Sequence, residues 1–258
     1  MRFNVITIFP EMFDSYLQES IIGRAIKEKK IKILFYNPRD FIKAPKNNYK
    51  PVDDKPYGGG PGMVMRAEPM LKAIEKALKI CSRSGFPATQ RQPFTKTHLQ
   101  RQKIKIILFS PSGKKFDTSY AKKSAKKYTD IILISGRYEG IDARVQKILK
   151  AEEISIGDYV LTGGELPAMV LIDSISRQIP GVLGKYESLE EERISSSEVY
   201  TRPEILKWKN KNYKVPKVLL SGNHKLIDEW KKGKFKTYSS SATRHSHTQP
   251  GRSHQDLR

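Results

Sequence analysis

The sequence predicts an α/β protein with a parallel-sheet core, followed by a small basic part near the C-terminus. Strand-like apolar runs alternate with helical patterns over residues 1–183, which is typical of a mainly parallel sheet with crossover helices. Glycine-containing loops follow several of these strands, at the edge where such sheets bind ligands. The chain has 258 residues, of which 38% are hydrophobic, so it can bury a real core.

The N-terminal segment predicts two strands with a helix between them. The run Phe3–Phe9 is β-branched and aromatic and ends at Pro10, which indicates a buried strand. Apolar residues recur at helical spacing in Glu11–Lys29, and Ile31–Tyr36 again has the composition of a strand. The segment Pro38–Gly62 contains five prolines and four glycines, so we expect a loop there. A loop of this length inside a compact domain is usually functional or disordered.

The middle of the chain predicts the rest of the sheet. Ala67–Ile80 has the spacing of a helix, and Ile104–Phe109 that of a strong strand, followed by a turn at 110–113. Ser82–Lys103, between them, is basic and has no apolar period, so we expect an exposed insertion.

A lysine-rich helix should then begin at a cap formed by Asp117 or Thr118 and end near Lys127. The remaining predicted elements are strands at Ile131–Ile134 and Ile154–Leu161 and a helix at Pro167–Ile179.

The formal net charge of +21 favours a polyanionic partner. A generally lysine-rich proteome or disordered basic segments would produce the same excess. The charge is concentrated, however, because Thr201–Thr237 carries eleven Lys or Arg against three Asp or Glu, a net +8. Aromatic residues are interleaved with these cations, and the combination suits phosphates and unstacked bases.

Other features indicate where the protein acts. No apolar run approaches the roughly 18 residues of a membrane span, and the N-terminus does not have the order of a signal peptide. Cys81 is the single cysteine, so no internal disulfide can form. We expect a cytoplasmic protein that contacts no membrane, with Cys81 as a small, partly buried hydrophobe at a helix end.

Three glycine-containing segments carry the main chemical signal. They are Pro56–Gly62, Ser135–Asp142 and Ile156–Glu165. Glycine permits positive φ and lets the backbone approach a ligand closely, although any one segment taken alone suits a tight turn. No Gly-Lys-Ser/Thr follows at P-loop spacing, and no G-x-G-x-x-G lies between a strand and a helix. ATPases and ordinary NAD-dependent enzymes are therefore disfavoured.

These segments, together with 9–13, 52–54, 110–111 and 166–169, resemble the bacterial tRNA (guanine-N1)-methyltransferases of the knotted SPOUT class. The resemblance runs from Met1 to about Lys231, interrupted by the insertion. It implies a deep trefoil knot, a homodimer, and transfer of a methyl group from S-adenosylmethionine to N1 of guanine 37 in tRNA, beside the anticodon.

The predicted domain division follows from the same resemblance and from composition. It consists of a SPOUT methyltransferase domain at 1–183 with an insertion at 82–103, an interdomain linker at 184–198, a reduced, mostly helical C-terminal tRNA-binding domain at 199–237, and a disordered tail at 238–258. Histidines in this tail have no Cys or acidic partners at ligand spacing, which argues against a metal site.

The resemblance implies a methyl-donor pocket built from the glycine loops. Backbone groups and apolar walls can hold an adenine, and Glu139 could face the cationic sulfonium or could be a surface carboxylate. The cofactor-binding positions are Pro111, Gly113, Gly136, Tyr138, Glu139, Gly140, Ile156, Gly157, Asp158, Tyr159, Val160, Leu161, Gly163, Gly164 and Pro167.

The reaction needs a general base and a cation that stabilises the negative charge on the guanine. Removal of the proton on guanine N1 by a positioned carboxylate is worth about 10²–10⁴-fold, and an arginine can stabilise the charge that builds on the base. The resemblance assigns these roles to Glu192, where the family has an aspartate, and to Arg177. Glu191 is the second choice for the base, and Asp53 is a third candidate. Alternatively, Arg177 is a solvent-facing helix residue and Glu187–Glu192 a solvated acidic linker.

The resemblance also implies contacts with tRNA. They fall on Arg137, Arg202, Lys217, Ser221, Asn223 and His224. Magnesium assists members of the family, but no acidic constellation indicates a site, so no metal ligand is assigned. No DNA partner is expected.

Two other functions stay open at this level. The chain could be another SPOUT RNA methyltransferase that acts on ribosomal RNA or on ribose, although the linker carboxylate argues against ribose. It could also be a non-catalytic RNA-binding relative, because Glu192 replaces an aspartate and the C-terminal domain is short.

Overall fold

The computed structural model describes residues 1–43, 50–82, 103–183 and 198–242. The chain divides into two compact units, Met1–Tyr186 and Glu187–Arg258. No helix within the described ranges is both long and apolar enough to cross a membrane.

Unit 1 is built on a five-stranded sheet in which every neighbouring pair is parallel, with the order β2-β1-β6-β5-β7. The strands are β1 (Arg2–Ile6), β2 (Lys32–Tyr36), β5 (Ile104–Lys115), β6 (Asp130–Ile134) and β7 (Glu152–Ser155). The helices are α1 (Asp14–Leu17), α2 (Ser20–Lys27), α3 (Ala67–Ser82), α5 (Thr118–Lys127), α6 (Ala143–Leu149) and α7 (Glu165–Ser176). The α/β class with a parallel core is confirmed.

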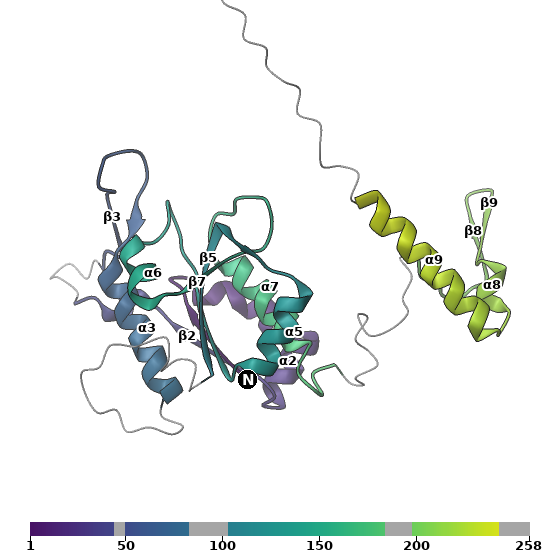
Figure 1. Ribbon diagram of the computed structural model, residues 1–258, viewed down its shortest axis with the longest axis horizontal. Coiled ribbons are helices and arrows are strands. Elements are labelled where there is room, and N and C mark those ends of the chain that lie inside the picture. The colour runs from purple at the N-terminus through teal and green to yellow at the C-terminus, as the bar shows by residue number, and fades with distance from the viewer. Residues whose placement is uncertain (44–49, 83–102, 184–197, 243–258) are drawn as a thin grey trace, which may run out of the picture. The chain divides into compact units, whose positions relative to one another are not determined.

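Helices cover both faces of this sheet, with α3 and α6 on one side and α2, α5 and α7 on the other (Figure 1). Each face buries its own apolar cluster. In β6, Ile132 and Ile134 belong to the cluster with α3, whereas Ile131 and Leu133 belong to the cluster with α7. A strand buried on both faces reads as a continuous apolar run, which explains why this strand was predictable.

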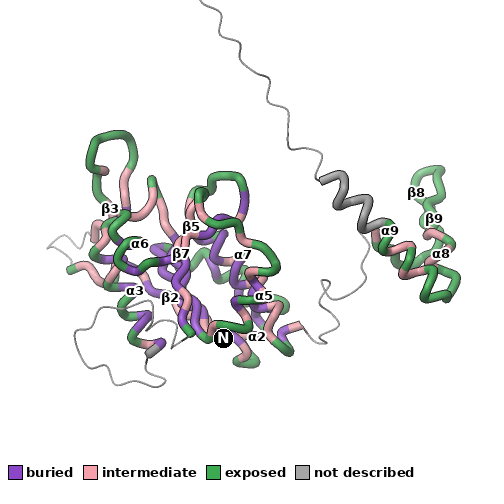
Figure 2. Tube along the Cα trace, viewed as in Figure 1, coloured by how far each residue is buried: buried purple, intermediate pink, exposed green. Residues whose placement is uncertain are grey.

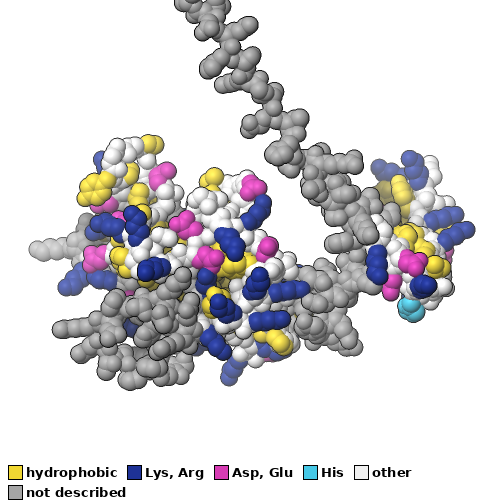
Figure 3. Space-filling model, viewed as in Figure 1, with side chains coloured by type: hydrophobic (Ala, Val, Ile, Leu, Met, Phe, Trp, Pro, Cys, Tyr) yellow, Lys and Arg dark blue, Asp and Glu magenta, His cyan; other side chains and the backbone are white. Residues whose placement is uncertain are grey.

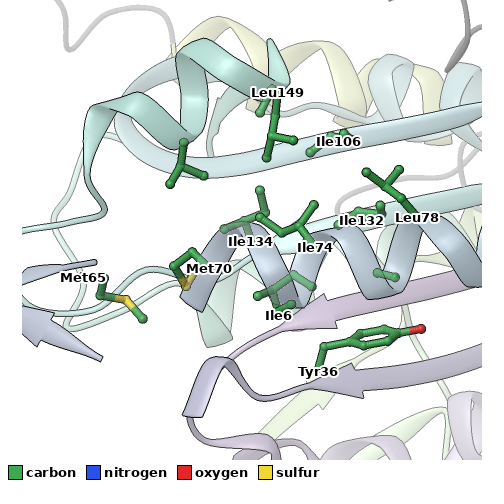
Figure 4. Close-up of a cluster of buried hydrophobic side chains, with 14 of the residues drawn as sticks. Ile6, Tyr36, Met65, Met70, Ile74, Leu78, Ile106, Ile132, Ile134 and Leu149 are labelled. Carbon is green, nitrogen blue, oxygen red and sulfur yellow. The ribbon is translucent and has the colours of Figure 1, made fainter. Parts of the chain in front are cut away.

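Figure 4 shows the first cluster, where Ile74 and Leu78 of α3 lie over Ile6 and Ile132 of the sheet. All four side chains are at most 1% exposed. Burial of such a side chain stabilises a fold by roughly 1.5–3 kcal/mol. Buried residues accordingly run along the strands and the inner helix faces, while the loops at the edge of the sheet are exposed (Figure 2).

The single helix predicted over Glu11–Lys29 is wrong. The segment forms a 3₁₀ turn, η1 (Pro10–Phe13), then α1 and α2, separated at Ser20, whose φ is 53°. The chain doubles back there, and a Cβ on Gly23 would lie 2.2 Å from the Gln18 carbonyl oxygen. The tight bend therefore interrupts a pattern whose apolar spacing is helical.

The strand predicted at Ile154–Leu161 is also wrong in position. The strand β7 ends at Ser155, and 158–161 are exposed, with Val160 at 82%. The turn predicted at 110–113 is part of β5, where the register with β7 shifts between Phe109 and Lys114. The helix α7 begins two residues earlier than predicted and ends at Ser176.

Some elements were missed and others were placed correctly. The helix α6, capped by Asp142, was not predicted. The predicted loop Pro38–Gly62 contains the 3₁₀ turn η2 (Pro38–Phe41) and β3 (Asp53–Asp54), which pairs antiparallel with β4 (Val64–Met65). The predicted cap of α5 is confirmed, because Asp117 accepts a hydrogen bond from the Tyr120 N–H at 2.6 Å.

Within its described residues, 198–242, unit 2 contains two helices and an antiparallel hairpin that was not predicted. Its elements are β8 (Ile205–Trp208), β9 (Lys211–Lys214), α8 (Lys217–Leu220) and α9 (His224–Ala242). The helix α9 continues to Ala242, so it includes 238–242, the first residues of the predicted tail. The rest of that tail, most of the linker 184–198 and most of the insertion 82–103 lie outside the described residues.

Candidate active site

One pocket of about 270 Å³ opens where three adjacent strands end. Its walls come from the segment around Ser110 in β5, the loop 136–140 after β6 and the loop 156–164 after β7. The carboxyl ends of parallel strands meet at one edge, so three distant segments converge. The predicted cofactor positions that line it are Pro111, Gly136, Tyr138, Glu139, Gly140, Ile156, Gly157, Tyr159, Val160, Leu161, Gly163, Gly164 and Pro167.

Two predicted cofactor positions do not line this pocket. A Cβ on Gly113 would lie 2.5 Å from the backbone nitrogen of Ile154, so this glycine serves the contact between β5 and β7. Asp158 is exposed and pairs with Lys115 at 3.0 Å. Each residue lies near the pocket in sequence but faces another contact in the structure, so a cofactor contact for either one stays a prediction.

Sequence reasoning missed five lining residues. They are Phe109, Ser110, Ile154, Ser155 and Thr162. Four of them lie within β5 and β7, next to the predicted positions. A signal was available, since any residue at the carboxyl end of a parallel strand borders this edge.

The second and third glycine loops touch through their backbones. The Gly164 N–H donates to the Gly136 carbonyl at 2.9 Å, and the Ser135 hydroxyl donates to the Gly164 carbonyl at 3.1 Å. A Cβ on Gly164 would lie 2.6 Å from the Cα of Ser135. Only glycine allows this approach, which joins the start of α7 to the end of β6.

The first glycine loop, 56–62, lies against the second. The Glu139 N–H donates to the Met63 carbonyl at 3.0 Å, and a Cβ on Gly62 would lie 2.6 Å from Cγ of Glu139. Gly58, Gly59 and Gly60 all have positive φ and would meet no atom within 4 Å of an added Cβ. This loop therefore stands free beside Glu139, at one side of the pocket.

Arg137 lies in the pocket wall, and the tRNA contact predicted for it stays a prediction. Its side chain is only 16% exposed, and its guanidinium lies over the Phe9 ring at 4.9 Å. Its Nε lies 2.9 Å from Oε2 of Glu165, an ion pair whose geometry falls short of a hydrogen bond. Glu165 is 1% exposed and its Oε1 accepts from the Thr7 hydroxyl at 2.9 Å. The charge of Arg137 is thus matched inside the wall.

The residues predicted for catalysis are only partly described. Arg177 follows α7 as its C-cap, and its buried Nε has no hydrogen-bond partner among the described residues. Asp53 is half-buried in β3, opposite Met65. Glu192 and Glu191 lie outside the described residues. A buried donor without an acceptor costs about 1–3 kcal/mol, so the environment of Arg177 is incomplete within the described residues.

The predicted tRNA residues of unit 2 are exposed, and two of them also shape the fold. The Asn223 Oδ1 accepts from a backbone N–H in the first turn of α9 at 3.3 Å. The Ser221 hydroxyl donates to a carbonyl of α8 at 2.8 Å and accepts from the Asn223 N–H. Arg202, Lys217 and His224 are exposed. Ser221 and Asn223 thus form the turn between α8 and α9.

Within the described ranges, no three His, Cys, Asp or Glu side chains gather as metal ligands would. No residue is therefore assigned to magnesium.

The chain is similar to known proteins over almost its whole length. A sequence profile of the family described as tRNA (Guanine-1)-methyltransferase TrmD matches residues 1–245. The tRNA (guanine-N(1)-)-methyltransferase of Clostridioides difficile (strain 630) is 45% identical over 236 residues, which cover 90% of this chain and 91% of the relative. That of Buchnera aphidicola subsp. Acyrthosiphon pisum (strain APS) is 46% identical over 233 residues, covering 89% and 87%.

The fold is similar to a crystal structure as well. The tRNA (m1G37) methyltransferase from Aquifex aeolicus superposes with a TM-score of 0.69 and is 35% identical, covering 94% of this chain and 93% of that chain. The resemblance inferred from the glycine segments is therefore confirmed. With a profile match over residues 1–245 and relatives above 40% identity along nine tenths of its length, the chain belongs to the tRNA (guanine-1)-methyltransferase family.

Proposed function

We propose that this protein transfers a methyl group from S-adenosylmethionine to N1 of guanine 37 in tRNA. The pocket formed where β5, β6 and β7 end carries the proposal, because it assembles glycine loops at the ligand-binding edge of a parallel sheet. The relatives named above are called tRNA (guanine-N(1)-)-methyltransferases, the Aquifex aeolicus protein is called a tRNA (m1G37) methyltransferase, and the similarity to them covers both units of the chain.

The pocket residues fit such a methyl donor. The side chains of Tyr138, Tyr159 and Leu161 offer flat and apolar walls, and the glycines bring backbone N–H and C=O groups to the surface. When bound, S-adenosylmethionine supplies an electrophilic methyl group on a cationic sulfonium. The Glu139 carboxylate lines the pocket and would favour that cation, whereas Glu165 already matches the charge of Arg137.

Arg177 and Glu192 would carry the chemistry. A carboxylate at Glu192 takes the proton from guanine N1, and Arg177 donates to the exocyclic oxygen where negative charge builds. The buried and unbonded Nε of Arg177 supports this role, since it needs an acceptor that the described part of the chain does not offer. Asp53 is kept as a further polar group near the substrate.

We also propose that the protein acts as a homodimer. Leu166 and Val170 lie on one side of α7 and are 52% and 44% exposed. Tyr16 in α1 is tied to the same helix, because its hydroxyl donates to Asp173 at 2.5 Å. This apolar stripe leads towards Arg177, and a second copy of the chain could cover the stripe and complete the surroundings of that arginine.

Further parts of the proposal concern organisation. The segments 1–183 and 199–237 would be the methyltransferase and tRNA-binding domains, joined by the linker 184–198, in a cytoplasmic protein. We infer a deep trefoil knot in the first domain. The contact of Gly164 with Ser135 supports it, because α7 begins beneath the loop that follows β6.

Methylation of a tRNA transcript tests the reaction. The intact chain should incorporate labelled methyl from S-adenosylmethionine, and changing guanine 37 should abolish incorporation. Arg177→Ala and Glu192→Gln should lower kcat by about 10²-fold or more while donor binding changes little. Glu187→Gln, in the same acidic segment, is the matched control. Full turnover by both active-site variants would refute the assigned roles.

The same assay separates the alternatives. Mass spectrometry of the digested RNA locates the methyl group, and a methylated ribose or a ribosomal RNA site would identify a different SPOUT activity. Tight tRNA binding without incorporation would identify a non-catalytic relative.

A further inference from the structure

The hairpin β8–β9 leaves large apolar side chains in water. All eight residues of its two strands are exposed. Trp208 is 63% exposed, Tyr213 is 54% and Leu206 is 52%. An isolated two-stranded hairpin is marginally stable, and these side chains gain little from folding when they remain uncovered. Their exposure therefore indicates a binding surface.

The register of the hairpin gathers these side chains on one face. Leu206 pairs with Tyr213, and Trp208 pairs with Lys211. Because side chains alternate along a strand and partners in a ladder share a face, these four residues form a single surface. We call it the aromatic face. Ile205, Lys207, Asn212 and Lys214 form the opposite face.

The two strands of the hairpin carry positive charges and no negative ones. Between Ile205 and Ile227 the sequence has six lysines and no acidic residue. No ion pair within the described part of the chain involves the lysines of the hairpin. In Figure 3, Lys and Arg side chains border the hydrophobic side chains of this unit. Flat apolar rings framed by unpaired cations match a nucleic acid strand, whose bases stack and whose phosphates carry the negative charge.

We propose that the aromatic face binds an unpaired nucleobase of an RNA strand, which stacks on Trp208 and Tyr213 while Lys211, on the same face, holds a flanking phosphate. The two rings are diagonal neighbours, and such neighbours lie about 7–8 Å apart. This is about twice the roughly 3.4 Å rise between stacked bases, so one base has room between them. The inference rests on the proposed function only for the identity of the RNA as tRNA.

Fluorescence of the full chain tests the stacking directly. Trp208 and Trp230 are the two tryptophans, and Trp230 packs near the Tyr200 ring at 6.3 Å. In a Trp230→Phe background, the emission therefore reports Trp208 alone. Adding a tRNA transcript, or a short unpaired oligoribonucleotide, should quench it. A blunt RNA duplex of equal length should quench it much less, since its bases are already stacked.

Binding to tRNA tests the contribution of each ring. Trp208→Ala and Tyr213→Ala should each raise the Kd for tRNA by about tenfold, whereas Trp208→Phe and Tyr213→Phe should restore most of the affinity. Lys211→Gln should reduce the salt dependence of binding by about one unit in the log–log slope. Leu220→Ala is the matched control, because Leu220 is 48% exposed in the same unit but lies outside the hairpin.

The outcomes distinguish this inference from the proposed function. For the alanine variants we expect a raised KM for tRNA, with unchanged kcat at saturating tRNA and unchanged donor binding. If the unaltered chain methylates tRNA and the hairpin variants bind tRNA as tightly as it does, the inference is overturned. The proposed function would still stand. Quenching of Trp208 by RNA without any methylation would support the inference and refute the function. Quenching by an acidic peptide but not by RNA would also overturn the inference.

Discussion

The carboxylate of Glu152 in β7 contacts side chains of β5 and α5. Its carboxylate accepts from the Tyr120 hydroxyl at 2.7 Å and pairs with Lys105. Burial raises the pKa of this carboxyl, but the contacts with Lys105 and Tyr120 outweigh burial and hold the pKa below the usual 4.5. A carboxylate whose pKa is lowered by folding stabilises the fold above its unfolded pKa, and the contribution is lost as pH falls through the folded pKa.

We therefore expect Glu152→Gln to lower the free energy of unfolding at pH 7. The difference from the unaltered chain should shrink as pH falls below about 4.5, because the carboxylate is then protonated in both states. Urea unfolding at several pH values measures this. Glu68→Gln is the control, since its pair with Lys72 is exposed to solvent, which screens the interaction. A pH-independent loss would contradict the explanation.

Cys81 gives a second expectation for a single residue. It is 5% exposed in α3, as the sequence predicted for a small hydrophobe at a helix end, and burial raises the pKa of its thiol to about 12. The thiolate is the reactive form, so a thiol reagent at pH 8 should modify the folded chain far more slowly than the chain in denaturant. Equal rates in the two conditions would show that the thiol is accessible.

At the scale of elements, the backbone contact between the end of β6 and the start of α7 depends on a glycine. Alanine at Gly164 would place a Cβ 2.6 Å from the Cα of Ser135, which is backbone and has no free rotation to give way. We expect Gly164→Ala to cost about 1–3 kcal/mol of stability and to weaken donor binding. In contrast, Gly233→Ala in α9 meets no atom within 4 Å and should stabilise the helix by up to about 1 kcal/mol. Thermal unfolding and equilibrium dialysis with S-adenosylmethionine compare the two variants.

The ion pair between Arg137, after β6, and Glu165, at the start of α7, links the same two elements. Removing one partner of a buried pair leaves the other charge uncompensated, at a cost of roughly 3–5 kcal/mol. Arg137→Met and Glu165→Gln should each destabilise the protein strongly, and the double variant should lose much less than the sum. A double-mutant cycle in urea measures the coupling, and additive losses would show that the two side chains act independently.

At the scale of the whole molecule, assembly is the main expectation. Val170→Asp would place a charge in the exposed apolar stripe of α7, where a second copy should pack. Sedimentation should show a dimer for the unaltered chain and a monomer for the variant, with methyl transfer reduced at least tenfold because Arg177 loses its surroundings. Lys123→Asp, on the exposed side of α5, is the control for a charge change. A monomeric unaltered chain with full activity would exclude the proposed dimer.

Much of the fold could be predicted because the relevant signals are local. The strand β6 is an unbroken apolar run, and Asp117 lies where a helix cap is needed. The bend at Ser20 and the end of β7 at Ser155 were not predictable in this way. The apolar residues after Ser155 have the composition of a strand, yet they border the pocket because the chain leaves the sheet there to meet the loop after β6.

The candidate site shows the same division. Glycine loops after strands, a basic C-terminal part and the absence of P-loop spacing were visible in the residues themselves, and the family resemblance turned them into a named activity. The pairing of Arg137 with Glu165 could not be predicted, because a sequence does not show which cation has a buried carboxylate beside it. The hairpin β8–β9 was missed because its strands are only four residues long, too short for an alternating pattern to stand out in a lysine-rich segment.

The sequence alone determined the α/β class and most of the strand and helix positions in the first unit. It also determined which types of residue gather at the edge of the sheet. These features are local, because periodicity, helix caps and glycines act over a few neighbouring residues. Only the tertiary structure decided which of those residues share one pocket, that Arg137 is matched by Glu165, and that Gly113 serves a strand contact. These facts depend on segments that are distant in the chain and meet when parallel strands align, so no local pattern encodes them.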